Sequence, residues 1–150
     1  ILHRLEMARL AFSDIPSCSV DDREIQRGGV SYTYQTICEL EAQWNPDEPI
    51  TLLIGYDLVA SLGAWRQWKQ LKARVQFLIA RRTTQHIDES LLEGVRWTSL
   101  DNPRVEVSSS RIRSLCSRGE DISGYVPRQV HRYIASRGLY GYNRPDTVQD

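Results

Sequence analysis

The chain has 150 residues, with 19 basic and 19 acidic side chains and a formal net charge of zero. This length suits one domain with a sizeable core. The balanced charge argues against a general nucleic-acid coat or an acidic-membrane binder, although a local basic patch could still bind phosphate. No apolar run approaches the roughly 20 residues that span a bilayer, and no signal peptide is visible. We therefore expect neither a nucleic-acid nor a membrane partner.

The cysteines and histidines indicate no metal site or disulfide framework. Cys18, Cys38 and Cys116 are odd in number and far apart, which fits inert, partly buried thiols in a cytoplasmic protein. The three histidines are isolated, and none has metal-ligand spacing or a neighbouring nucleophile. We expect structural or solvated roles for them, with His131 at the solvated edge of a helix.

Hydrophobic periodicity predicts helices alternating with short apolar strands, separated by glycine and proline. In chain order we expect a helix at 2–12, a strand at 17–25, a helix after residues 31–33, a strand at 50–54, a helical stretch through 62–71, a strand at 75–80, a short helix at 87–93, a strand at 95–100 or 105–107, and helices at 110–118 and 127–137.

This alternation implies βαβ units and a mostly parallel sheet, so the expected fold class is α/β. No repeat or long linker divides the chain, and we expect a single domain over residues 1–150. In such sheets ligands bind beyond the carboxyl ends of the strands. Residues 55–57 and 108–110 occupy such positions and are the first candidates for a site.

Three serines, Ser108, Ser109 and Ser110, lie between a predicted strand end and a predicted helix. A helix start offers unpaired N–H groups and a positive dipole end, which favour an anion. Hydroxyls can cap the helix or turn toward that anion, and Arg113 adds a guanidinium that suits phosphate. Arg111, two residues away, is expected to face elsewhere. The alternative is a solvated helix start with a surface arginine.

Two further loops are candidate binding segments. Gly55 allows a close backbone approach and Asp57 can accept a hydrogen bond from a ribose hydroxyl; the alternative is an ordinary turn with Asp57 as a helix cap. Residues 31–33, Ser-Tyr-Thr, could present helix-start N–H groups to a carboxylate or simply cap the helix.

Trp65 and Trp68 are three residues apart, so they are expected to share one helical face. Core packing is the ordinary role of tryptophan and suits Trp68. Trp65 is the candidate for stacking on a planar aromatic ligand.

In this combination and order, the motifs resemble those of bacterial nicotinate-nucleotide adenylyltransferases, a branch of the HIGH-motif nucleotidyltransferase superfamily. The matching segments, which run along nearly the whole chain, are Arg4–Met7, Ser31–Thr33 with Thr36, Gly55–Asp57, Trp65, Ser108–Arg113, Tyr125–Pro127 with Val130, Tyr133–Ile134 and Leu139–Tyr140.

The resemblance implies a Rossmann-like, mostly parallel sheet with helices on both faces. It implies transfer of the adenylyl group of ATP to nicotinate mononucleotide in NAD biosynthesis, giving deamido-NAD and pyrophosphate, with Mg²⁺ assisting and no protein nucleophile. Trp65 would stack on the pyridine ring, backbone N–H groups near Thr33 and Arg66 would hold its carboxylate, and Asp57 would contact the mononucleotide near its ribose. The implied mononucleotide site comprises Tyr32, Thr33, Gly55, Asp57, Trp65 and Arg66, and the implied ATP site comprises Ser108, Ser109, Ser110 and Arg113.

One departure from the family pattern is large. The sequence contains no His-x-Gly-His, the motif that ends the family's N-terminal glycine-rich segment. In the family, that segment supplies the first strand and the histidines that bind the ATP phosphates in the transition state. The chain begins at Ile1 and its only methionine is Met7, so we expect a processed, cleaved or truncated start. We therefore expect no catalytic residue of this motif in the chain, and little or no transferase activity from these 150 residues alone.

Two alternatives stay open at this point. One is a related nucleotidyltransferase that acts on another phosphorylated substrate, against which Trp65 and residues 31–33 argue. The other is a nucleotide-binding module without catalysis, which would bind ATP but release no pyrophosphate.

Overall fold

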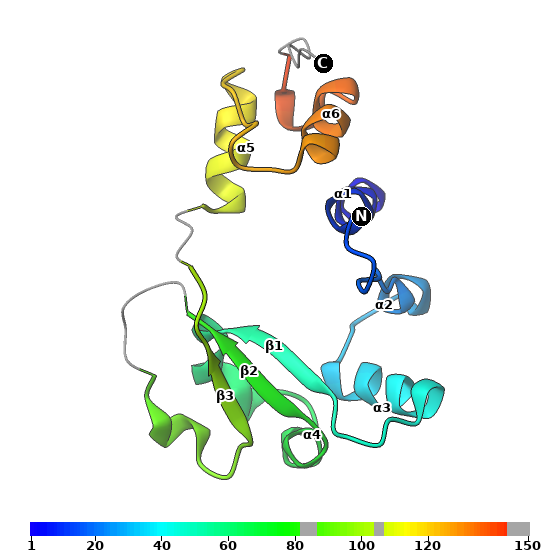
Figure 1. Ribbon diagram of the computed structural model, residues 1–150, viewed down its shortest axis with the longest axis vertical. Helices are drawn as coiled ribbons and strands as arrows, with labels where there is room; N and C mark the ends of the chain where they lie inside the picture. The colour runs from blue at the N-terminus through cyan, green and yellow to red at the C-terminus, as the bar shows by residue number, and fades with distance from the viewer. Residues whose placement is uncertain (82–86, 104–106, 144–150) are drawn as a thin grey trace. The chain divides into compact units, whose positions relative to one another are not determined.

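The computed structural model describes residues 1–81, 87–103 and 107–143. The chain forms two compact units, one made of Ile1–Asp22 with the residues from Val107 onward, and the other of Arg23–Glu106. Each unit has its own core and is described by itself, in the labels of Figure 1. The expected single domain over residues 1–150 stays a prediction.

The unit of residues 23–106 is built on a three-stranded parallel sheet (Figure 1). Its strands are β1 (Thr51–Gly55), β2 (Gln76–Ala80) and β3 (Trp97–Leu100), in the order β1-β2-β3. Ile54 lies opposite Ile79, and Ile79 lies opposite Ser99. Since parallel neighbours need crossover connections, helical segments separate each strand from the next. All three carboxyl ends therefore lie along one edge of the sheet.

Short helices surround this sheet in the same unit. They are α2 (Arg23–Arg27), α3 (Thr33–Trp44), the 3-10 helix η1 (Tyr56–Ala64), α4 (Trp68–Arg74) and the 3-10 helix η2 (Glu89–Leu92). Strands β1 and β2, α3, η1, α4, η2 and two connecting residues bury a common core, to which α2 contributes no buried side chain. Its members are Ile37, Ile54, Val59, Leu62, Leu71, Val75, Phe77, Ile79, Ile87 and Leu92. Each large side chain buried here contributes about 1.5–3 kcal/mol, so the core fixes the loops at the carboxyl edge.

The other unit is helical. Its helices are α1 (Leu2–Phe12), α5 (Ser109–Ser117), α6 (Arg128–Ser136) and the 3-10 helix η3 (Leu139–Gly141). Their core comprises Leu115, Cys116, Ile122, Val130, Ile134 and Tyr142. His3 Nδ1 lies 2.9 Å from the Tyr133 hydroxyl, which ties α1 to α6.

His131 corrects one expectation from the sequence. The residue is 5% exposed rather than at a solvated helix edge. Its Nε2 lies 3.0 Å from the Tyr142 hydroxyl, and the two rings meet edge to face with centroids 5.7 Å apart. The periodicity of α6 could not predict this burial, because the partner, Tyr142, lies beyond the helix. Its hydroxyl replaces the water that we expected beside the imidazole.

Most predicted elements are confirmed, with boundary shifts of a few residues. The strand expected at 17–25 is wrong, because residues 17–22 have no regular structure and α2 occupies 23–27. Asp21 and Asp22 precede that helix, where acidic residues favour a helix start over a strand. The alternative strand at 105–107 lies largely outside the described residues. Within the described parts of the chain, no helix is both long and apolar enough to cross a membrane.

Candidate functional site

The start of α3 forms one wall of a pocket in the unit of residues 23–106. Tyr32 is the N-cap residue, in extended conformation at φ −118° and ψ 125°, and no side chain caps the helix. The first turn of α3 contains no acidic residue. Since uncapped N–H groups and the helix dipole both favour a negative group, this end of α3 suits a carboxylate or phosphate.

A turn between η1 and α4 forms the opposite wall. Trp65 ends η1 in extended conformation at φ −67° and ψ 141°, and Gln67 then adopts the left-handed region at φ 54°. This break corrects the continuous helix expected through residues 62–71. It also means that Trp65 and Trp68 do not share a helical face. Trp68 begins α4 and packs on Phe77 with ring centroids 5.6 Å apart, as the core role predicted.

These two walls enclose the aromatic pocket, a cavity of about 290 Å³. The Trp65 side chain is half-buried at its edge. The guanidinium of Arg66 lies 4.5 Å from the ring centroid of Tyr32, a cation–π distance. The pocket thus combines aromatic surface, one cation and a helix start. Its lining residues are Ser31, Tyr32, Thr33, Ala64, Trp65 and Arg66.

Gly55 and Asp57 lie where β1 passes into η1 and do not line the aromatic pocket. The Asp57 carboxylate folds back over Gly55, so that an added Cβ at residue 55 would lie 2.3 Å from Asp57 Oδ1. Asp57 is not the helix cap considered from the sequence, because Gly55 holds that position. Glycine at residue 55 therefore leaves room for this placement of the carboxylate.

The three serines at the start of α5 have separate roles. Ser108 is the N-cap, and its side chain accepts a hydrogen bond of 3.2 Å from the Arg111 N–H. Ser110 Oγ accepts a hydrogen bond of 3.1 Å from Arg113 Nη2. Arg111 instead lies over the ring of Tyr125, with its guanidinium 5.4 Å from the centroid, as expected for an arginine that faces away from Arg113.

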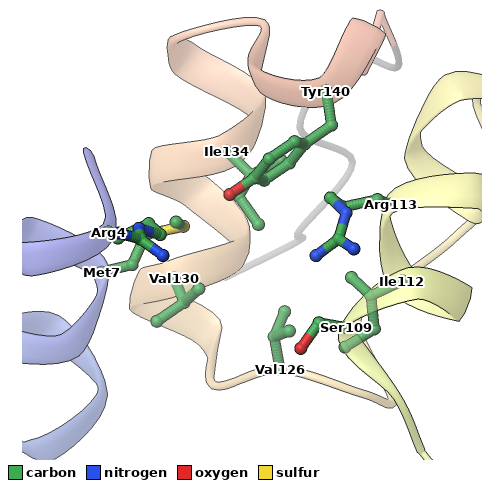
Figure 2. Close-up of a pocket in the computed structure, with 9 residues that line it drawn as sticks. All are labelled: Arg4, Met7, Ser109, Ile112, Arg113, Val126, Val130, Ile134 and Tyr140. Atoms are coloured by element: carbon green, nitrogen blue, oxygen red, sulfur yellow. The ribbon is translucent and has the colours of Figure 1, made fainter. Parts of the chain in front are cut away.

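Ser109 and Arg113 line a second cavity, also about 290 Å³, which we call the arginine pocket (Figure 2). The Arg113 guanidinium projects from α5 into its centre, and Tyr140 faces it from η3 (Figure 2). Apolar side chains of α1, α5 and α6 form most of the remaining wall. The lining residues are Arg4, Met7, Ser109, Ile112, Arg113, Val126, Val130, Ile134 and Tyr140.

The structure therefore gathers the candidate residues into two groups. Tyr32, Thr33, Trp65 and Arg66 meet in the aromatic pocket, with Gly55 and Asp57 elsewhere in the same unit. Ser109 and Arg113 meet in the arginine pocket, and Ser108 and Ser110 flank them on α5.

Sequence reasoning gave no role to Arg4 or Tyr140, although both line the arginine pocket. Tyr140 adopts φ 57°, between two glycines that also have positive φ. A bulky residue in this region is uncommon, and the nearby glycines Gly138 and Gly141 accompany it. Arg4 and Tyr140 both belong to segments that resemble the family, but those segments assign neither residue a role.

Residues 2–115 match the family model of the cytidylyltransferase-like proteins, and the chain belongs to this family. Its class is therefore that of the nucleotidyltransferases. A probable nicotinate-nucleotide adenylyltransferase of Gemmatimonas aurantiaca is 36% identical over 144 residues, covering 92% of this chain and 68% of the relative. This similarity confirms the resemblance found in the motifs.

Solved structures show the same fold. Plasmodium falciparum nicotinic acid mononucleotide adenylyltransferase, complexed with APC, superposes with a TM-score of 0.75 at 22% identity, over 95% of this chain and 77% of that one. The same enzyme complexed with NaAD gives a TM-score of 0.75 at 22% identity, over 95% and 75% of the two chains. The expected Rossmann-like α/β fold is thus confirmed.

Proposed function

We propose that the protein transfers the adenylyl group of ATP to nicotinate mononucleotide, in NAD biosynthesis. A phosphate oxygen of the mononucleotide attacks the α-phosphorus of ATP, the bond to the β-phosphate oxygen breaks, and deamido-NAD and pyrophosphate form. The observation that carries the proposal is the aromatic pocket, where an uncapped helix start, Trp65 and Arg66 meet. This combination suits a flat ring that bears a carboxylate.

In this proposal the aromatic pocket binds the nicotinate ring. Trp65 provides a face for stacking, since aromatic rings prefer offset or edge contacts with other rings. The N–H groups near Thr33 and Arg66 hold the carboxylate, helped by the dipole of α3. The guanidinium of Arg66 lies over the ring of Tyr32, 4.5 Å from its centroid. Asp57 accepts a hydrogen bond near the ribose, and Gly55 leaves space for it.

The start of α5 binds the phosphates of ATP. Ser108 caps the helix, so its position is fixed by the fold, while Ser109, Ser110 and Arg113 present hydroxyls and a guanidinium. Hydrogen bonds from charged donors to phosphate are shorter and stronger than neutral ones. Catalysis then consists of positioning two anionic substrates and stabilising the charge on the leaving pyrophosphate.

In this proposal Mg²⁺ binds together with ATP, on the phosphates of the nucleotide. Within the described residues, no group of three or more His, Cys, Asp or Glu side chains could hold a metal ion. The residues proposed for the phosphates are hydroxyls and an arginine, which suit phosphate oxygens rather than a cation. When bound, Mg²⁺ neutralises phosphate charge, and this chain's residues orient the phosphates that carry it.

The proposal is tested by incubating the protein, in the form its source cell makes, with ATP and nicotinate mononucleotide. We expect deamido-NAD and pyrophosphate in equal amounts, and slower turnover of nicotinamide mononucleotide, which lacks the carboxylate. ATP binding without pyrophosphate release would instead indicate a binding module. Turnover of a different phosphorylated substrate with the mononucleotide left unused would indicate another transferase.

The sequence of 150 residues has no His-x-Gly-His motif, which stabilises the transition state in the family it resembles. We therefore propose that the 17.3 kDa chain alone binds its substrates but yields little deamido-NAD. A robust yield from a chain confirmed at that mass would contradict this part of the proposal.

A further inference from the structure

Two arginines of the helical unit face one cavity from different helices. Arg113 comes from α5 and Arg4 from α1, and both line the arginine pocket. Figure 2 shows them on opposite sides of the cavity, with Met7 beside Arg4. The spacing of three residues places Arg4 and Met7 on the same face of α1, and Met7 packs against the core of this unit. Arg4 therefore lies on the side of α1 that borders the cavity, and its side chain is exposed there.

The charge of this cavity is not balanced by the residues around it. Its nine lining residues include two arginines and neither aspartate nor glutamate. Within the described chain, Arg113 hydrogen-bonds only to the neutral Ser110, and the Arg4 side chain has no hydrogen bond or ion pair. By contrast, Arg9 of the same helix α1 pairs with Asp22 at 2.9 Å. Both arginine side chains are exposed, so each can reach an anion that enters the cavity. Two guanidiniums without an acidic neighbour in the lining favour a multiply charged anion such as a polyphosphate.

We propose that Arg4 is a second binding residue for the polyphosphate of ATP, acting from α1 while Arg113 acts from α5. This inference rests on the proposed function and deepens it. Arg113 and the serines bind the phosphates at the start of α5, and Arg4 contacts the end that leaves as pyrophosphate. Its charge offsets the negative charge that the leaving group gains when the bond to the α-phosphorus breaks.

The test is calorimetric titration of the protein, in the form its source cell makes, with inorganic pyrophosphate, ATP and nicotinate mononucleotide. The variants are Arg4→Gln, which keeps much of the stem, and Arg4→Lys, which keeps the charge. The matched control is Arg111→Gln, an arginine that lies over Tyr125 outside the pocket. Thermal unfolding of each variant is measured alongside and should match the parent chain, since Arg4 makes no polar side-chain contact within the described residues.

For Arg4→Gln we expect the Kd of pyrophosphate to rise about 10- to 100-fold, as for a lost charged hydrogen bond. The Kd should depend less steeply on salt, Arg4→Lys should recover part of the affinity, and binding of the mononucleotide should change by less than about twofold. The Arg111→Gln control should bind pyrophosphate like the parent chain. These results together support the inference.

The inference is overturned if the parent chain does not bind pyrophosphate, or if Arg4→Gln binds it as well as Arg111→Gln does. Failure of the proposed function has a different signature. If Arg4→Gln weakens pyrophosphate binding but the protein makes no deamido-NAD, Arg4 is an anion-binding residue and the reaction assignment is wrong. If deamido-NAD forms while Arg4→Gln binds pyrophosphate normally, the proposed reaction is supported and the proposed role of Arg4 is wrong.

Discussion

The guanidinium of Arg66 lies 4.5 Å from the centre of the Tyr32 ring, which joins the turn after η1 to the start of α3. Cation–π contacts of this kind contribute about 0.5–1 kcal/mol at exposed sites. The contact orients a positive charge beside the uncapped N–H groups of α3. The aromatic pocket thus has two sources of positive potential, the exposed guanidinium of Arg66 and the start of α3.

Replacing Trp65 with alanine tests the stacking role. We expect the Kd of nicotinate mononucleotide to rise about tenfold or more, because base–aromatic stacking contributes about 1–3 kcal/mol. The Kd of ATP should change by less than about twofold. The control is Trp44→Ala, since Trp44 is 59% exposed and does not line the aromatic pocket. Equal weakening of both ligands by Trp65→Ala, with a lower melting temperature, would indicate general destabilisation instead.

Gly55→Ala tests the placement of Asp57. Alanine is acceptable at the φ of −76° found there, but its Cβ would lie 2.3 Å from Asp57 Oδ1 and displace the carboxylate. We expect the Kd of the mononucleotide to rise several-fold while the free energy of unfolding changes by less than about 0.5 kcal/mol. The matched control is Gly63→Ala, where an added Cβ meets nothing within 4 Å. Adding Asp57→Ala to Gly55→Ala should cause little further loss, and fully additive effects would contradict this account.

Ser108 and Arg113 should separate stability from binding. Ser108→Ala removes the helix cap of α5 and should lower the free energy of unfolding by about 1 kcal/mol. Arg113→Ala should leave that free energy nearly unchanged and raise the Kd of ATP about tenfold or more. Denaturant unfolding and ATP titration of the two variants give both quantities. If instead Arg113→Ala lowers the free energy of unfolding and leaves the Kd of ATP unchanged, this segment is the solvated helix start that the sequence left open as the alternative.

The buried pair of His131 and Tyr142 should be a stability determinant with no role in binding. Tyr142→Phe removes the hydroxyl that lies 3.0 Å from His131 Nε2 and leaves a buried polar atom unpaired, at about 1–3 kcal/mol. In a double-mutant cycle, His131→Phe should lower the free energy of unfolding less in the Tyr142→Phe variant than in the parent chain. A strictly additive cycle in urea unfolding would show that the hydrogen bond is not formed in solution.

Burial raises the pKa of the Cys116 thiol above its ordinary value. A thiol reagent should therefore react quickly with the exposed Cys18 and reach Cys116 only after unfolding. The contribution of the Cys116 thiol to the free energy of unfolding is complete below the ordinary thiol pKa of about 8.5. It decreases as the pH rises toward the pKa of the folded state, because the thiol of the unfolded chain ionises first. Cys116→Ala should flatten the decrease in the free energy of unfolding above pH 8.5, and an unchanged slope would contradict this assignment.

The strands were predictable because short apolar runs between breakers suit a buried parallel sheet, and β1 and β2 lie within a residue of the expected runs. The candidate residues could be named from motifs in the sequence, as at Ser108–Arg113, and the structure gathers Tyr32 and Trp65 into one pocket. Their binding roles stay predictions. The break at Gln67 could not be predicted, because residues 62–71 have helical periodicity. In the structure Gln67 adopts a left-handed conformation, and Trp68, the first residue of the new helix, packs on Phe77. Arg4 and Tyr140 line the same pocket through tertiary packing, which no periodic pattern in one sequence can predict.

Each pocket takes its whole lining from one compact unit of the chain. On the proposed assignment, the residues that recognise the nicotinate ring lie in one unit and those that bind the polyphosphate lie in the other. A protein engineer could then change recognition of the ring in one unit without repacking the core of the other. Acceptor choice and phosphate affinity would then be separable traits, each open to its own series of substitutions.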